Sequence, residues 1–107
     1  MSAKPSPKPE VTGQNFPALR AFLRGYFHQD MREEYGTPEE ATRQFCEDAD
    51  SLERKQVAVE WKRFVDQTQR EPLATINRLL TQKLGSSVTL SEDQFTAISD
   101  IFQNPPR

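Results

Sequence analysis

The sequence predicts an all-α fold, a single compact domain of about five helices. Apolar residues recur at spacings of three and four in five segments, and that spacing gathers them on one face of a helix. Residue types that cap or break helices bound these segments. The one stretch with β propensity, residues 87–90, is too short and too isolated to build a sheet.

The first two predicted helices are joined by an aromatic turn. Pro17 suits the first turn of a helix, so the first helix is expected to begin there. The second opens with Thr37, Pro38 and Glu40, an N-cap hydroxyl, a proline at the first position and a glutamate that can complete a capping box. The residues expected to face the core are Leu19, Phe22, Leu23, Tyr26 and Phe27, then Ala41, Phe45 and Ala49.

Three more helices are predicted, each with its own start or stop signal. Ser51 is expected to cap the third and longest helix, residues 52–69. The fourth begins at Pro72 and stops at Gly85, and Ser91 caps the fifth. Their inward stripes are Val57, Trp61, Phe64, Val65 and Thr68; Leu73, Ile76, Leu80 and Leu84; and Phe95, Ile98, Ile101 and Phe102.

The chain of 107 residues is expected to form one domain with unstructured ends. Residues 1–15 hold three of the eight prolines and lack apolar periodicity, so they predict a disordered tail. The helical domain spans residues 16–103, and prolines make residues 104–107 a frayed end. No apolar run approaches the ~20 residues that cross a bilayer, and no secretory signal opens the chain. The expected location is the cytoplasm.

Charge is distributed unevenly along a chain whose formal net charge is only −2. Residues 33–53 carry eight carboxylates and one arginine, a net charge of −7, whereas residues 54–83 carry seven bases and three acids, a net charge of +4. The bases alternate with acids, as Lys62 and Asp66 do at i, i+4. A surface that binds nucleic acid is therefore not expected.

The acidic segment is the first candidate for a binding surface. The helix dipole accounts for acids near helix starts, such as Glu39 and Glu40. Glu47 and Asp48 instead fall in the last turn of the second helix, where the dipole disfavours negative charge, and no local stability argument accounts for them. The surface expected to meet a basic partner comprises Glu33, Glu34, Glu39, Glu40, Glu47, Asp48 and Asp50. The alternative is an ordinary solvated acidic face.

The turn after the first helix carries the only histidine. Its residues Tyr26, His28, Asp30 and Tyr35 either fix the angle between two helices or belong to the partner-binding surface. In the structural interpretation, His28 satisfies carbonyl groups at the helix end and Asp30 caps the short turn at residues 31–35. The sequence alone does not separate these two interpretations.

An enzymatic interpretation would pair His28 with Asp30, or with Cys46 as the nucleophile. No orienting group or oxyanion donor accompanies these residues, so catalysis is not expected. A metal site would lack ligands, because one histidine and one cysteine leave only carboxylates. We therefore expect no enzyme activity, no cofactor and no metal.

A distinctive motif spans residues 16–45. It begins with Phe16-Pro17, continues through aromatic-His-Gln-Asp at residues 27–30 and Tyr-Gly-Thr-Pro-Glu-Glu-Ala at residues 35–41, and ends with Phe45. At this spacing the motif resembles the opening of the immunity proteins of bacterial contact-dependent growth inhibition systems. The similarity extends over residues 16–102, with the identifying detail in residues 16–45.

This resemblance implies an antitoxin, a cytoplasmic protein without enzyme activity. It would bind and neutralise, by direct docking, the C-terminal toxin domain delivered by a neighbouring cell. That toxin is expected to be a nuclease acting in the cytoplasm. The implied partner is the toxin domain, with no nucleic acid or membrane, bound 1:1 by a protein that is monomeric alone. A helical adaptor in another assembly is the alternative that the same fold and charge pattern allow.

Overall fold

The structure is a computed structural model that describes residues 10–104. Its helices are α1 (Pro17–Tyr26), α2 (Met31–Glu34), α3 (Pro38–Asp48), α4 (Ser51–Thr68), α5 (Leu73–Arg78) and α6 (Glu92–Gln103), with a π-helical turn, η1 (Leu79–Lys83), directly after α5. No strand occurs between residues 10 and 104, so the all-α prediction is confirmed. The five predicted helices correspond to α1, α3, α4, α5 with η1, and α6.

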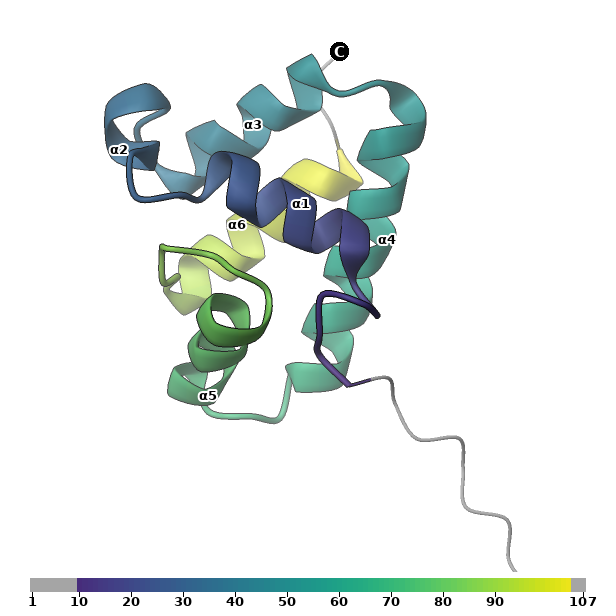
Figure 1. The fold of residues 1–107 in the computed structure, drawn as a ribbon, viewed down its shortest axis with the longest axis vertical. Helices are drawn as coiled ribbons and strands as arrows, with labels where there is room; N and C mark the ends of the chain where they lie inside the picture. The colour runs from purple at the N-terminus through teal and green to yellow at the C-terminus, as the bar shows by residue number, and fades with distance from the viewer. Residues whose placement is uncertain (1–9, 105–107) are drawn as a thin grey trace, which may run out of the picture.

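Helix α1 crosses the middle of the molecule, with α3 above it, α5 below it and α6 behind it in Figure 1. It packs against α4 and α3, and α6 packs against the same two helices from the other side. The central position of α1 explains why Leu19, Phe22 and Leu23 are all buried. None of the helices in residues 10–104 combines the length and the apolar character needed to cross a membrane.

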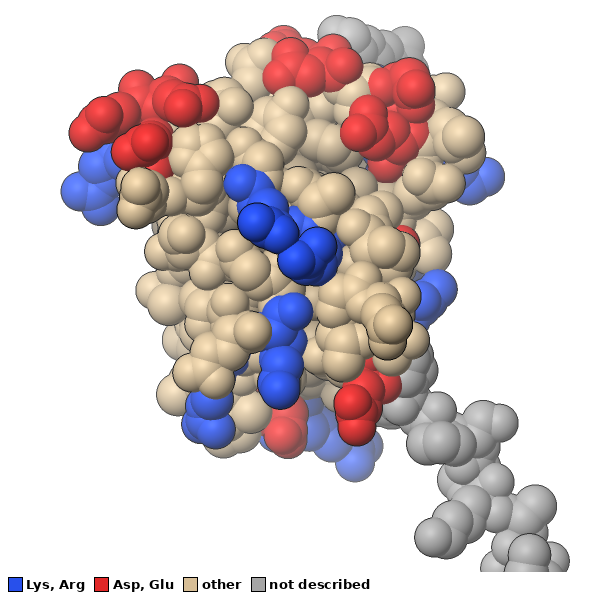
Figure 2. Space-filling view, viewed as in Figure 1, with Lys and Arg blue, Asp and Glu red and all other residues tan. Residues whose placement is uncertain are grey.

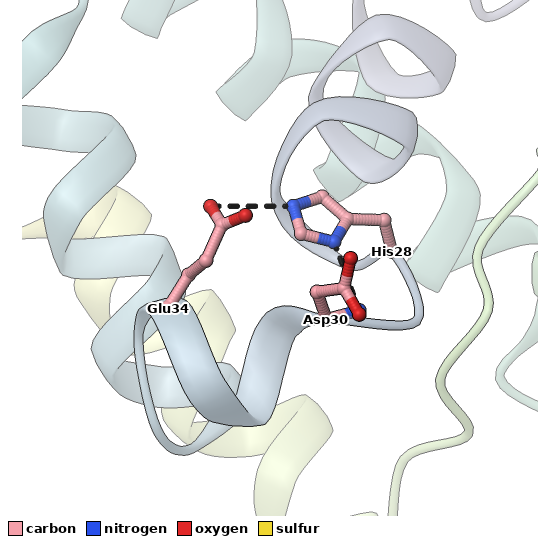
Figure 3. Close-up of side chains that lie close together, drawn as sticks. All are labelled: His28, Asp30 and Glu34. Carbon is pink, nitrogen blue, oxygen red and sulfur yellow. Dashed lines mark hydrogen bonds and ion pairs between the residues drawn. The ribbon is translucent and has the colours of Figure 1, made fainter.

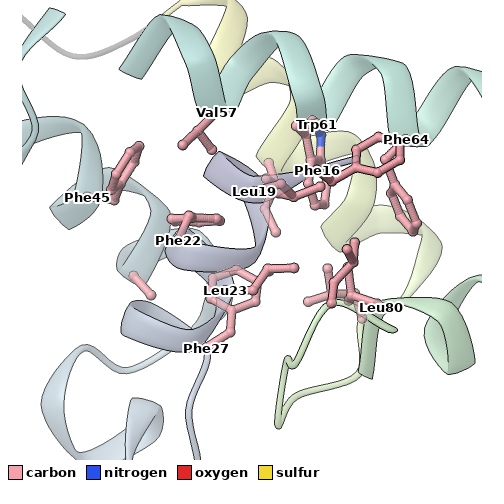
Figure 4. Packing of buried hydrophobic residues seen from close by; sticks show 14 of the residues in the cluster. Phe16, Leu19, Phe22, Leu23, Phe27, Phe45, Val57, Trp61, Phe64 and Leu80 are labelled. Carbon is pink, nitrogen blue, oxygen red and sulfur yellow. The ribbon is translucent and has the colours of Figure 1, made fainter. Parts of the chain in front are cut away.

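Aromatic rings form the centre of the core (Figure 4). The ring of Phe22 lies 5.1 Å from that of Phe27, 4.8 Å from that of Phe45 and 5.6 Å from that of Phe102, measured between centroids. Such pairs add about 0.5–1.5 kcal/mol each beyond the burial of their area. The predicted stripes are confirmed, except that six of their residues are only partly buried: Tyr26, Val65, Leu73, Ile76, Phe95 and Phe102.

The caps of α3 and α6 follow the predicted chemistry, whereas the cap of α4 does not. The Thr37 hydroxyl accepts from the N–H of Glu40 while the Glu40 carboxylate accepts from the N–H of Thr37, which completes the predicted capping box. Ser91 caps α6 in the same way. The cap predicted for α4 at Ser51 is wrong. Asp50 fills that position, with its Oδ1 accepting from the N–H of Glu53 at 2.8 Å, and Ser51 already lies inside the first turn.

The fourth predicted helix changes pitch before it ends. After Arg78 the chain widens into the π-helical turn η1, and Gly85 closes the end with φ of +84°, a conformation that favours glycine. Beyond it, Asn77 holds the loop before α6: its amide donates to the carbonyl of Leu90 at 2.8 Å and its Oδ1 accepts from the N–H of Leu90 at 2.7 Å. The stretch with β propensity is therefore paired with a side chain rather than with a strand.

The segment before α1 is partly ordered. Of the residues expected in a disordered tail, 10–15 form turns in which the N–H of Phe16 donates to the carbonyl of Thr12 at 3.0 Å, and Val11 packs into the core at 9% exposure. A single apolar residue produces no periodicity, so the sequence pattern gave no indication of this contact. The rest of the predicted tail, residues 1–9, and residues 105–107 of the predicted frayed end lie outside the described residues.

Candidate functional site

Acidic side chains gather along the upper edge of the face in Figure 2, near α2, α3 and the start of α4, whereas basic side chains cross its middle. Of the seven acids predicted for the binding surface, six are exposed. The exception is Glu39, which is half-buried and whose Oε1 is closed off from solvent with no hydrogen-bond partner among the described residues. We call the other six the acidic face: Glu33, Glu34, Glu40, Glu47, Asp48 and Asp50.

A shallow groove of about 340 Å³ crosses the acidic face between α2 and α3. It is lined by Glu34, Tyr35, Glu40, Arg43, Gln44 and Glu47. Arg43 and Gln44 were not predicted as site residues, although their spacing from Glu40 and Glu47 places all four on one side of α3. The groove thus combines three carboxylates with one guanidinium, an aromatic ring and an amide.

Several acids of this face have a structural partner. Glu40 completes the cap of α3, and Asp50 caps α4. Glu34 lies 3.6 Å from Nε2 of His28. No hydrogen bond or ion pair of the Glu33 or Glu47 carboxylate is present in the described part of the chain. Glu47 is therefore the groove acid whose charge serves no local purpose in residues 10–104.

Asp48 has a local role that its sequence position did not indicate. Its Oδ2 accepts from the hydroxyl of Tyr26 at 2.7 Å, and its Oδ1 accepts from the Gln44 amide at 2.8 Å. Tyr26 in turn stacks on Tyr35, with 5.2 Å between ring centroids. Burial, reinforced by the Asp48 carboxylate, raises the pKa of Tyr26 well above its ordinary value of 10. Asp48 thus links α3 to the end of α1.

The histidine turn is held by contacts different from those predicted (Figure 3). His28 does not satisfy helix carbonyls; its Nδ1 accepts from the N–H of Asp30 at 3.1 Å. The Asp30 side chain makes no capping hydrogen bond to α2, and its main-chain carbonyl accepts from Glu33 and Glu34 instead. The hydrogen bonds expected of His28 and Asp30 are therefore replaced by others, and the choice between a structural turn and a partner-binding surface stays a prediction.

His28, Asp30 and Glu34 place potential metal-ligand atoms within 4.8 Å of one another. The hydrogen bonds of the histidine oppose such a use. Because Nδ1 accepts a hydrogen bond, the proton of the neutral ring resides on Nε2, which faces Glu34. To bind a metal, Nε2 would need a free lone pair instead of that proton. The arrangement suits an ordered turn better than a cation site.

Cys46 is not a candidate nucleophile. Its side chain is 1% exposed inside α3, and burial raises the pKa of its thiol, although the nearby Arg54 opposes that effect. The thiolate is the reactive form of cysteine, so this environment favours the inert form. Arg54 donates to the carbonyl of Cys46 at 2.9 Å, which gives that pair a structural role.

Comparison with known proteins assigns the chain to a family. The family model described as CdiI immunity protein matches residues 15–98, most of the chain. This range includes the histidine turn, the acidic face and all of α4. No curated protein and no solved structure gives a significant match.

Proposed function

Because this chain belongs to the CdiI immunity protein family, we propose that it neutralises its cognate toxin by docking directly on it through the acidic face. Family membership implies an immunity function and a toxin protein as the partner, and such proteins generally act without catalysis. The docking mode, the toxin class and the contact surface are the parts proposed here.

The groove between α2 and α3 is the observation that carries the proposal. Glu34, Glu40 and Glu47 line it together with one opposing base, Arg43. Desolvating three carboxylates is costly unless a partner supplies cations, so this groove suits lysine or arginine side chains of a basic protein. Glu47 is the best placed to contribute, since no local hydrogen bond or ion pair of its carboxylate is present in residues 10–104.

A nuclease is the toxin class that best fits such a surface. Enzymes that act on nucleic acid present basic surfaces to the phosphate backbone. An acidic face bound there would satisfy the same cations and exclude the polyanionic substrate by charge and by volume. The protein would then inhibit as a competitor of nucleic acid, in a 1:1 complex.

The test is a growth assay that pairs this protein with the C-terminal domain encoded immediately upstream. The domain is expressed in susceptible cells with and without the immunity protein, and the complex is then purified. Rescue of growth with a 1:1 complex supports direct docking. Nuclease activity of the free domain, lost in the complex, supports the toxin class. Toxicity that persists despite soluble immunity protein would contradict the proposed pairing.

A further inference from the structure

Large apolar side chains are exposed on the outer side of α4. Leu52 is 64% exposed and Val59 is 49% exposed, the two highest values for large apolar residues in the described chain. They are seven residues apart and lie on the same side of the helix, opposite the buried Val57, Trp61 and Phe64. Helix α4 therefore carries apolar residues on both sides, although the core needs only one.

Val59 forms one wall of a groove between α4 and α6. The groove has a volume of about 370 Å³, and its lining includes Lys55, Val59, Trp61, Lys62, Val65 and Phe102. This volume lies at the lower end of the range of about 300–1,000 Å³ typical of ligand sites, and the aromatic and aliphatic floor is also typical. The groove is large enough to receive an apolar side chain from a partner.

The rim of this groove carries excess positive charge. Lys62 pairs with Asp66 at 2.9 Å, but both side chains are more than half exposed. An exposed ion pair of this kind stabilises a protein only weakly, so Lys62 can change partners at little cost. No ion pair of Lys55 is found within residues 10–104. Two ammonium groups and one carboxylate therefore border the apolar floor.

We propose that the α4–α6 groove is the apolar anchor site for the toxin domain. An apolar side chain of the toxin enters beside Val59, and a neighbouring carboxylate of the toxin meets Lys55. This inference rests on the proposed function. The α4–α6 groove supplies an apolar anchor, which the groove between α2 and α3 lacks. Interfaces concentrate their binding energy in desolvated apolar or aromatic anchors rather than in charged rims.

The two surfaces adjoin along the chain. Asp50 belongs to the acidic face and caps α4, and Leu52 follows in the first turn of that helix. One partner can therefore contact the acids and then continue along α4 toward Val59. The acidic face would steer the encounter, and the α4–α6 groove would determine how long the complex lasts.

The chain contains a single reporter for this site. Trp61 is its only tryptophan, it lines the groove, and its indole N–H donates to the Ser99 hydroxyl at 2.9 Å. In the ¹⁵N-labelled protein the indole N–H gives one resonance. Adding the unlabelled toxin domain is expected to shift that resonance, whatever tryptophans the toxin itself contains.

Substitutions separate the apolar and charged contributions. Val59→Asp is expected to weaken toxin binding about tenfold or more, and the milder Val59→Ser should weaken it less. The matched control is Ala74→Asp on the exposed surface of α5. Lys55→Glu is expected to weaken binding severalfold, whereas Lys83→Glu, the same change on the exposed surface of η1, should not.

Each outcome is decisive. Suppose that the toxin binds, but Val59→Asp binds it as tightly as the unmodified protein does and the Trp61 resonance does not shift. The anchor site is then overturned and the proposed function stands. If the toxin does not bind at all, the proposed function fails and the anchor site fails with it. If the Trp61 resonance shifts when the free protein is concentrated without toxin, a second copy of the chain is the occupant, which also overturns the proposal.

Discussion

The Glu60 carboxylate on α4 accepts a hydrogen bond from the main-chain N–H of Leu19, at 2.9 Å and across 41 positions of sequence. Helix α1 begins with Phe16 at its N-cap, a residue with no side-chain acceptor. A carboxylate from another helix thus takes the place of a local cap and lies at the positive end of the α1 dipole.

Removing this remote cap should destabilise the fold. Glu60→Ala is expected to lower the free energy of unfolding by about 1–2 kcal/mol, the range found for lost helix caps. Glu60→Gln retains an acceptor oxygen and should cost less. Urea denaturation of the two variants measures the difference, and equal losses would show that the hydrogen bond to Leu19 is not the cause.

The identity of the α4 cap gives a second prediction. Asp50→Ala should cost about 1 kcal/mol, because its Oδ1 accepts from the N–H of Glu53. Ser51→Ala should be nearly neutral, since Ser51 lies inside the helix and makes no cap. Thermal unfolding of the matched pair tests the assignment, and a larger loss for Ser51→Ala would reverse it.

The raised pKa of Tyr26, caused by burial and then by the hydrogen bond to Asp48, predicts a loss of stability at alkaline pH. Folding raises the pKa of Tyr26, so the folded protein keeps the phenol proton at pH values where the unfolded chain, with a pKa near 10, has lost it. The folded state then binds more protons, and stability falls as the pH rises above about 10.

Tyr26→Phe isolates this contribution. At neutral pH the variant should lose about 1 kcal/mol with the hydrogen bond to Asp48. Between pH 9 and 11 its stability should then fall less steeply than that of the unmodified protein, because one titrating group is gone. Urea titrations at several pH values give both slopes, and parallel slopes would argue against a raised pKa.

Charge changes in the groove between α2 and α3 should alter the rate of toxin association. Glu47→Lys is expected to slow association severalfold at low salt and to leave stability almost unchanged, since no local partner of Glu47 is lost in the described residues. Arg43→Ala removes the opposing base of the groove and should speed association. Stopped-flow kinetics at two salt concentrations measures both effects.

Glu71→Lys provides the control for that experiment. Glu71 is exposed beyond the end of α4 and outside the acidic face, and its reversal changes the net charge of the protein by the same amount. If it slows association as much as Glu47→Lys, total charge rather than the groove governs the encounter.

The sequence was sufficient for the helices because their signals are local. Stripes such as Leu19, Phe22 and Leu23 and the capping box at Thr37 depend only on nearby residues. The contacts that it missed join distant residues or compete locally. Tyr26 reaches Asp48 across 22 positions, and Asp50 and Ser51 are both good caps, of which only the geometry selects one.

The candidate site was less predictable for the same reason. Spacing on α3 brings Glu40 and Glu47 together, but Glu34 joins them only because the histidine turn brings α2 beside α3. The predicted core stripe of α4 leaves Val59 on the outer side, but the groove beside Val59 was not predictable, because it forms only where α4 packs against Phe102 of α6.

The concentration of acidic side chains along the upper edge in Figure 2 gives a nearly neutral protein an electric dipole moment. With a formal net charge of −2, the molecule feels little overall pull from a distant charged body, but it does feel a torque. In the field of a cationic partner it would turn its acidic edge forward before contact, over separations set by the Debye length of about 8 Å at physiological salt. Its orientation at the moment of collision would then be biased rather than random.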